Sequence, residues 1–127
     1  SAGAAAMDLH ACIDEAVTLA PGGRAFLPTG IAIALPSAEY VALVFDRSGL
    51  GIKHGIALSN GVGVIDSDYR GEIGVGLVNL SGTPYTVAPG DRIAQLAVVP
   101  VVHAALTPVE ELDETARGAG GFGSTGK

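Results

Sequence analysis

The residues best suited to chemistry lie in one segment, NGVGVIDSDYRG at residues 60–71. Its apolar run VGVI leads directly into Asp66, and Tyr69 follows in the same turn. A carboxylate at the end of a strand is held rigidly enough to orient a water molecule, and a tyrosine ring offers a flat wall to a sugar. The segment is also compatible with a hairpin whose Asx-turn tip is solvated. Both interpretations stay open on this segment alone.

A second segment combines three anion-binding groups. Arg47, Ser48 and Gly49 come shortly after the apolar run VALVF, so a guanidinium, a hydroxyl and a bare backbone amide emerge together at a strand end. Such a combination suits an anion, although an isolated Arg-Ser-Gly is more often a simple turn. Ser48 lacks the G-x-S-x-G context of a nucleophilic serine, and the histidines show no metal-ligand spacing. The segment therefore predicts either an anion clamp or a surface turn.

The C-terminal segment RGAGGFGSTGK, residues 117–127, differs in composition from the rest of the chain. It has five glycines and one aromatic residue, which is too little apolar surface to hold it folded. We expect a flexible arm that follows a single domain at residues 1–116. A disordered terminus is the commoner case, but Phe122 places a stacking ring among phosphate donors, which favours an arm that orders over a ligand. These donors are Arg117, Ser124 and Thr125. The glycine spacing alone does not predict a P-loop or dinucleotide site, because no helix follows it.

Composition indicates an all-β domain. The chain has 19 glycines and no tryptophan, and a glycine inside a helix costs roughly 1 kcal/mol. Short β-compatible runs separated by turn signals are typical of a sandwich, jelly roll or barrel. The one helix-like segment is Thr107–Thr115, where Thr107 is a candidate cap and Pro108 a first-turn residue. We expect roughly eight to ten strands, with three in residues 16–35 and others at 40–45, 55–58, 62–65, 72–80, 85–87 and 92–102.

The charge balance argues against a nucleic-acid partner. Seven Lys and Arg stand against thirteen Asp and Glu, for a net charge of −6, and the basic residues form no stripe. Cys12 is the single cysteine, so an intramolecular disulfide is impossible and a buried apolar role is expected. An apolar run of about 18 residues and a basic-then-apolar leader are both missing, so we expect no membrane partner and a cytoplasmic protein.

Taken in order, five segments resemble the five motifs of the trimeric dUTP diphosphatase (dUTPase) family. The match spans almost the whole chain, and five motifs in order are far more specific than any one of them. The resemblance implies a jelly-roll-like β barrel, a homotrimer, and active sites that draw motifs from more than one subunit. The segments are AMDL at 6–9, RSGLG at 47–51, the segment 60–71, GDRIAQL at 90–96, and the arm from 117 to 126.

The resemblance also implies a reaction: hydrolysis of dUTP to dUMP and pyrophosphate, which keeps uracil out of DNA and supplies dUMP for dTMP synthesis. Asp66 would orient and deprotonate the water that attacks the α-phosphorus. Asp8 would hold the cofactor Mg²⁺ through water, as a hard cation prefers. The substrate-binding residues that it implies are Asn60 for the uracil edge, Tyr69 for deoxyribose, Arg47, Ser48, Gly49 and Gln95 for the phosphate chain, and Arg117, Phe122, Gly123, Ser124 and Thr125 in the arm.

Two positions depart from the family pattern. Ala6 stands where glycine is usual in the first motif, and Asp46 stands where proline usually precedes Arg-Ser-Gly. We expect Asp46 to pair with Arg47 and to weaken its grip on phosphate, which would reduce the affinity for dUTP without loss of activity.

Three other functions account for part of the sequence. A dCTP deaminase of the same superfamily would need a glutamate at the cytosine ring, and Glu72 lies beyond the turn. A non-catalytic trimeric scaffold would be expected to lose Asp66, Tyr69 or the arm, and this chain keeps all three. A generic jelly-roll binding module explains the strands but leaves the five motifs as a coincidence.

Overall fold

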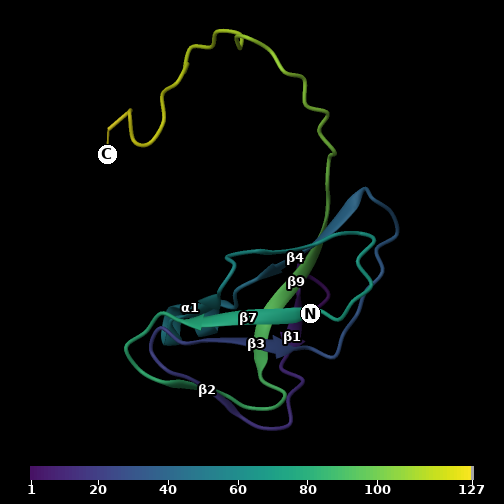
Figure 1. Cartoon of the computed structure of the whole chain (residues 1–127), viewed down its shortest axis with the longest axis vertical. Coiled ribbons are helices and arrows are strands. Elements are labelled where there is room, and N and C mark those ends of the chain that lie inside the picture. The colour runs from purple at the N-terminus through teal and green to yellow at the C-terminus, as the bar shows by residue number, and fades with distance from the viewer. Residues whose placement is uncertain (127) are drawn as a thin grey trace.

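Strands dominate the computed structural model, which describes residues 1–126; Lys127, the last residue of the expected arm, lies outside the described residues. One short helix separates β4 from β5. The segment after β9 leaves the body of the protein and arcs over it (Figure 1). The elements are β1 (Met7–His10), β2 (Val17–Leu19), β3 (Arg24–Pro28), β4 (Tyr40–Phe45), α1 (Ser48–His54), β5 (Ile56–Leu58), β6 (Gly63–Ile65), β7 (Gly74–Asn79), β8 (Tyr85–Val87) and β9 (Arg92–Pro100).

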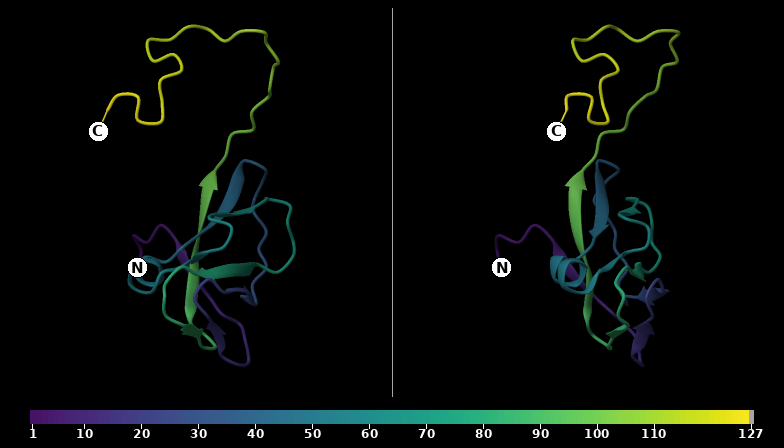
Figure 2. Two further views of the ribbon diagram at one scale, coloured as in Figure 1. Left: turned by 60° about the vertical axis from the view of Figure 1, so that its left-hand side comes forward. Right: turned by 90° about the vertical axis from the view of Figure 1, so that its left-hand side faces the viewer.

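Three antiparallel sheets surround one core. Their strand orders are β1-β9-β4-β6, β3-β7-β5 and β2-β8. Strand β9 pairs with β1 on one side and with β4 on the other, so strands from both ends of the domain lie side by side (Figure 2). Such long-range antiparallel closure is what a jelly-roll-like barrel requires, and the expected fold class is confirmed. It also brings the strands of the first and fourth motifs to one sheet, together with β4, which leads into the second motif.

The core follows from period-two alternation along the strands. In β7, Val75, Leu77 and Asn79 are buried, whereas Gly74 and Gly76 face outward. Successive side chains of a strand point to opposite faces, so each strand has one apolar face to bury. The largest fully buried apolar side chains are Leu9, Leu19, Ile56, Leu77, Ile93, Val75 and Val87.

The helix α1 was missed because its residues, SGLGIKH, include two glycines, which favour turns. Tertiary packing overrides this preference, since Leu50 is buried in the core. The helix ends at Gly55, whose φ of 67° is left-handed and whose N–H donates to the carbonyl oxygen of Gly51 at 3.1 Å. Among residues 1–126, no helix is long and apolar enough to cross a membrane.

Three further expectations are wrong. Residues 107–115 form no helix and are exposed; a helix this short is marginal in water without a surface to pack on. Residues 31–35 form no strand, and β1 was not expected at all. Cys12 is exposed rather than buried. In each case tertiary contacts, or their lack, outweigh local propensity.

Asn79 supports the turn that packs against the end of α1. It is 0% exposed, and its Nδ2 donates to the carbonyl oxygens of Leu19 at 2.9 Å and Thr83 at 2.8 Å. Its Oδ1 accepts from the backbone N–H of Ser81 at 2.9 Å. Asn79→Ala would leave the buried Leu19 carbonyl oxygen unpaired and would remove the bonds to Ser81 and Thr83, so we expect a loss of about 2–4 kcal/mol in the free energy of unfolding. Urea unfolding measures it. Thr18→Ala, which removes an exposed hydroxyl contact, should cost less than about 1 kcal/mol; equal losses would contradict the prediction.

Candidate active site

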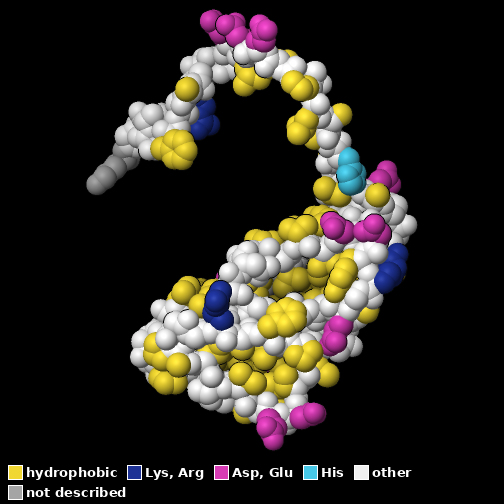
Figure 3. All heavy atoms as spheres, in the orientation of Figure 1, with side chains coloured by type: hydrophobic (Ala, Val, Ile, Leu, Met, Phe, Trp, Pro, Cys, Tyr) yellow, Lys and Arg dark blue, Asp and Glu magenta, His cyan; other side chains and the backbone are white. Residues whose placement is uncertain are grey.

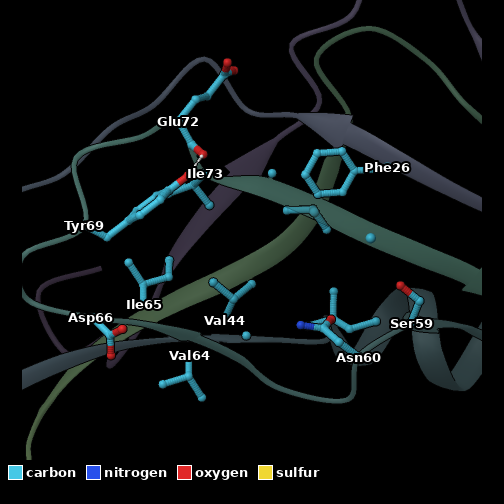
Figure 4. A pocket seen from close by; sticks show the side chains of 15 residues that line it. Phe26, Val44, Ser59, Asn60, Val64, Ile65, Asp66, Tyr69, Glu72 and Ile73 are labelled. Carbon is cyan, nitrogen blue, oxygen red and sulfur yellow. Dashed lines mark hydrogen bonds between the residues drawn. The ribbon is translucent and has the colours of Figure 1, made fainter.

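A cavity of about 460 Å³ opens between the turn after β6 and the outer face of β7. Three of the residues expected from the sequence, Asn60, Asp66 and Tyr69, line it. In Figure 4 Asp66 and Tyr69 lie toward one end of the cavity and Asn60 toward the other. Residues separated along the chain thus face one hollow, as a binding site requires.

Backbone and side-chain hydrogen bonds stiffen the turn that carries Asp66. Asp66 directly follows β6, and its carbonyl oxygen accepts from the N–H of Tyr69 at 3.2 Å. The Tyr69 hydroxyl donates to the carbonyl oxygen of Glu72 at 2.9 Å, and a carboxylate oxygen of Glu72 accepts from the N–H of Gly30 at 2.8 Å. The ring of Tyr69 is therefore fixed as a wall, with 47% of the residue still exposed.

The opposite wall was not recognised from the sequence. Phe26 lines the cavity with its ring against Gly74 (Figure 4), and a Cβ atom at Gly74 would overlap that ring. A Cβ at Gly76 would likewise overlap the hydroxyl of Ser59. Both glycines thus make room for side chains that line the cavity. Only the pairing of β3 with β7 brings Phe26 here, and no local motif signals it.

A second group of expected residues lies on the sheet that contains β1 and β9. The Asp8 carboxylate accepts from Nε of Arg47 at 2.9 Å and lies 3.5 Å from Nη1 of Arg92. Partial desolvation raises the pKa of Asp8, but the hydrogen bond and charge of Arg47, together with the charge of Arg92, outweigh it and lower that pKa below its ordinary value. Arg92 belongs to the fourth motif, but only the pairing of β1 with β9 reveals that it is a residue of this group. Asp8 thus stays ionised at neutral pH.

Asp46 does not pair with Arg47, and that expectation is wrong. The Asp46 carboxylate instead accepts from the backbone N–H of Leu58 at 2.7 Å, while Arg47 turns to Asp8. Gln95 lies opposite Asp8 in the register of β1 and β9, and its Nε2 donates to the Asp46 carbonyl oxygen at 2.8 Å. The negative charge of Asp46 is directed to β5 and not to the guanidinium.

Ser48 and Gly49 form the first residues of α1, directly after Arg47. Both are exposed. A first helical turn leaves its backbone N–H groups without intrahelical partners, so the Ser48 hydroxyl and these amides are available as donors directly after Arg47 in the chain.

The arm lies apart from both groups in this chain. Within residues 104–126, the hydrogen bonds found all join residues of the same segment. Arg117, Phe122, Gly123, Ser124 and Thr125 surround a separate hollow of their own. Figures 1 and 2 show this segment extended beyond the body. A single chain therefore does not bring the arm to the cavity.

No cluster of three or more metal-ligating side chains occurs in the part of the chain that the structure describes. A metal held here would depend on few protein ligands. Asp8 is a candidate, since its side chain is 35% exposed.

Comparisons with known proteins agree on one family. A family model described as dUTPase matches residues 1–126. The deoxyuridine 5'-triphosphate nucleotidohydrolase of Neisseria meningitidis serogroup B is 56% identical over 124 residues, which cover 98% of this chain and 83% of that protein. A Staphylococcus bacteriophage 80alpha dUTPase with dUPNHPP superposes with a TM-score of 0.87 at 28% identity, covering 100% of this chain and 89% of that one. A dUTPase variant from phage phi11 of S. aureus, whose structure reveals a structural Mg(II) ion, has a TM-score of 0.76 at 26% identity, covering 88% and 87%.

Proposed function

This chain belongs to the dUTPase family and is a dUTP diphosphatase, and on that premise we propose how its own residues carry out the reaction. Asp66 accepts a proton from the water that attacks the α-phosphorus of dUTP, so that dUMP and pyrophosphate are released. The observation that carries this role is the place of Asp66, at the end of β6 in the cavity that Asn60 and Tyr69 also line. Displacement at phosphorus needs a positioned nucleophile more than covalent chemistry by the protein.

In this proposal the phosphate chain is bound by four residues: Arg47, Ser48, Gly49 and Gln95. Arg47 uses Nε for Asp8, and its terminal nitrogens have no hydrogen-bond partner among residues 1–126, so they remain for phosphate oxygens. The backbone amides at the start of α1 are further hydrogen-bond donors for the phosphate oxygens.

Asp8 is the residue that fits a magnesium ion. Mg²⁺ usually keeps several waters and is bound through one or two carboxylates together with substrate phosphates, and Asp8 is an ionised, partly exposed carboxylate beside the phosphate-binding arginine. Both of its oxygens face guanidinium groups, which favours contact through water. When bound, the ion would neutralise charge on the polyphosphate.

The nucleoside is selected by the cavity. Asn60 and the backbone around it bind the uracil edge, and Tyr69 packs against deoxyribose so that a 2′-hydroxyl has no room. Tyr69→Ala would open this wall, and we expect kcat/KM for UTP relative to dUTP to rise at least about tenfold. Tyr69→Phe removes only the hydrogen bond to Glu72 and should keep the wild-type preference. Steady-state rates with both nucleotides measure the ratio; an unchanged ratio in Tyr69→Ala would show that another group excludes the ribose.

A homotrimer with shared sites completes the proposal. The segment between β9 and the arm exposes Val102, Leu106 and Leu112, each by at least 85%. Apolar side chains are spaced along this segment (Figure 3), and a neighbouring copy would cover them. The phosphate donors of the arm and Phe122 lie away from the cavity that Asp66 of the same chain lines. We infer that these residues close over the site of another copy, with Phe122 stacked on uracil and Arg117, Gly123, Ser124 and Thr125 at the γ-phosphate.

The deciding experiment offers dUTP, dCTP, dTTP and UTP with Mg²⁺ and measures the release of pyrophosphate and of ammonia. Release from dUTP alone is expected. Deamination of dCTP without pyrophosphate would favour the deaminase alternative, and no reaction with any nucleotide would favour a non-catalytic scaffold. Repeating the dUTP assay with EDTA tests the cofactor, since activity should fall. The cytoplasmic location stays a prediction.

A further inference from the structure

Asp46 joins three segments of the proposed site. It lies between β4 and Arg47, and its carboxylate accepts from the N–H of Leu58 at 2.7 Å. Its carbonyl oxygen accepts from the Gln95 side chain at 2.8 Å. Leu58 is the last residue of β5 and lies just before the loop that carries Asn60. One residue therefore links the phosphate-binding segment to the strand that leads into the base-binding loop.

The N–H of Leu58 needs such a partner. Strand β5 is at the edge of its sheet, and the next residue, Ser59, uses its N–H to bond the Gly76 carbonyl at 2.9 Å. Because hydrogen-bonded pairs alternate along an antiparallel ladder, the N–H of Leu58 points away from β7. Leu58 is only 5% exposed, and an unpaired N–H at such a position is costly. The Asp46 carboxylate satisfies it.

We propose that Asp46 is a positioning residue, which holds residues 47–49 in a fixed relation to residues 59–61 so that the phosphate chain and the base of one nucleotide are bound together. This inference rests on the proposed function. A proline here, as in the family pattern that the sequence resembles, would have no acceptor side chain, so the link depends on the aspartate. The expected effect on affinity is the opposite of the one inferred from charge alone: the aspartate helps binding.

Enzyme kinetics test the link through its acceptor. Asp46→Ala and Asp46→Pro remove the side-chain acceptor, and KM for dUTP should rise about fivefold to tenfold while kcat stays within about twofold, because the interaction serves substrate and transition state alike. Asp46→Asn keeps an oxygen that accepts from Leu58 and should stay within about twofold of wild type in both constants. Asp14→Ala, an exposed carboxylate outside the site, is the matched control and should match wild type. Unchanged KM in Asp46→Ala, or a defect in Asp46→Asn as large as in Asp46→Ala, would overturn the proposal.

Amide hydrogen exchange tests the same link without catalysis. In wild type, the Leu58 amide should exchange at least about tenfold more slowly than in Asp46→Ala, while Asp46→Asn keeps the protection. If the wild-type Leu58 amide exchanges as fast as a solvent-exposed amide, the proposal is wrong even if the alanine variant fails to fold. If protection behaves as expected but wild type does not hydrolyse dUTP, the fault lies with the proposed function, because the hydrogen bond itself has been demonstrated.

Discussion

Asp66→Asn is expected to lower kcat for dUTP by about 10²- to 10⁴-fold, because an amide cannot accept the proton of the attacking water. The substitution keeps the size of the side chain, and the turn is held by backbone and Tyr69 hydrogen bonds that do not use the carboxylate. KM should therefore stay within about twofold, as for an interaction needed in the transition state. Steady-state pyrophosphate release with saturating Mg²⁺ measures both constants.

The control for this variant is Asp14→Asn, which neutralises an exposed carboxylate outside the site. It should retain wild-type kcat, and thermal unfolding should show both variants folded. A fall in kcat of less than about tenfold in Asp66→Asn would mean that another group activates the water. Loss of dUTP binding without a change in kcat would assign Asp66 to binding instead.

Removal of residues 117–127 is expected to lower kcat/KM for dUTP at least about 10²-fold, since the missing donors and the stacking ring would otherwise close the site. The barrel should unfold at nearly the same temperature, because the hydrogen bonds found for residues 117–126 do not reach the barrel of their own chain. Kinetics and thermal unfolding of the shortened chain measure the two effects. A large drop in thermal stability would instead make the segment part of the fold.

Mixing the two inactive proteins tests whether sites are shared. When Asp66→Asn chains and chains without residues 117–127 are unfolded and refolded together, mixed assemblies can join an intact Asp66 from one chain with an arm from another. Activity should reappear above the sum of the separate proteins, and light scattering should give the mass of a trimer. No recovery, with mixed trimers present, would place each complete site within one chain.

Local patterns in the sequence determined several features of the site. The strand at 40–45 and the strand at 85–87 were predicted with the bounds that the structure shows, because their alternation and β-branched residues act over a few residues. The segment with Asn60, Asp66 and Tyr69 was predicted in the same way, since its residues are close in sequence. The ordered motifs identified the family. These are short-range signals, and a single segment carries each one.

The tertiary structure alone decided which segments meet. Pairing of β1 with β9 placed Asp8 opposite Gln95, and pairing of β3 with β7 brought Phe26 to the cavity. Burial of Leu50 formed a helix from a glycine-containing turn sequence. The partner of Asp46 was misjudged because the nearest charge in sequence, Arg47, was assumed to be the nearest in space. Antiparallel register between distant strands sets such contacts, and residues far apart along the chain carry no local signal of it.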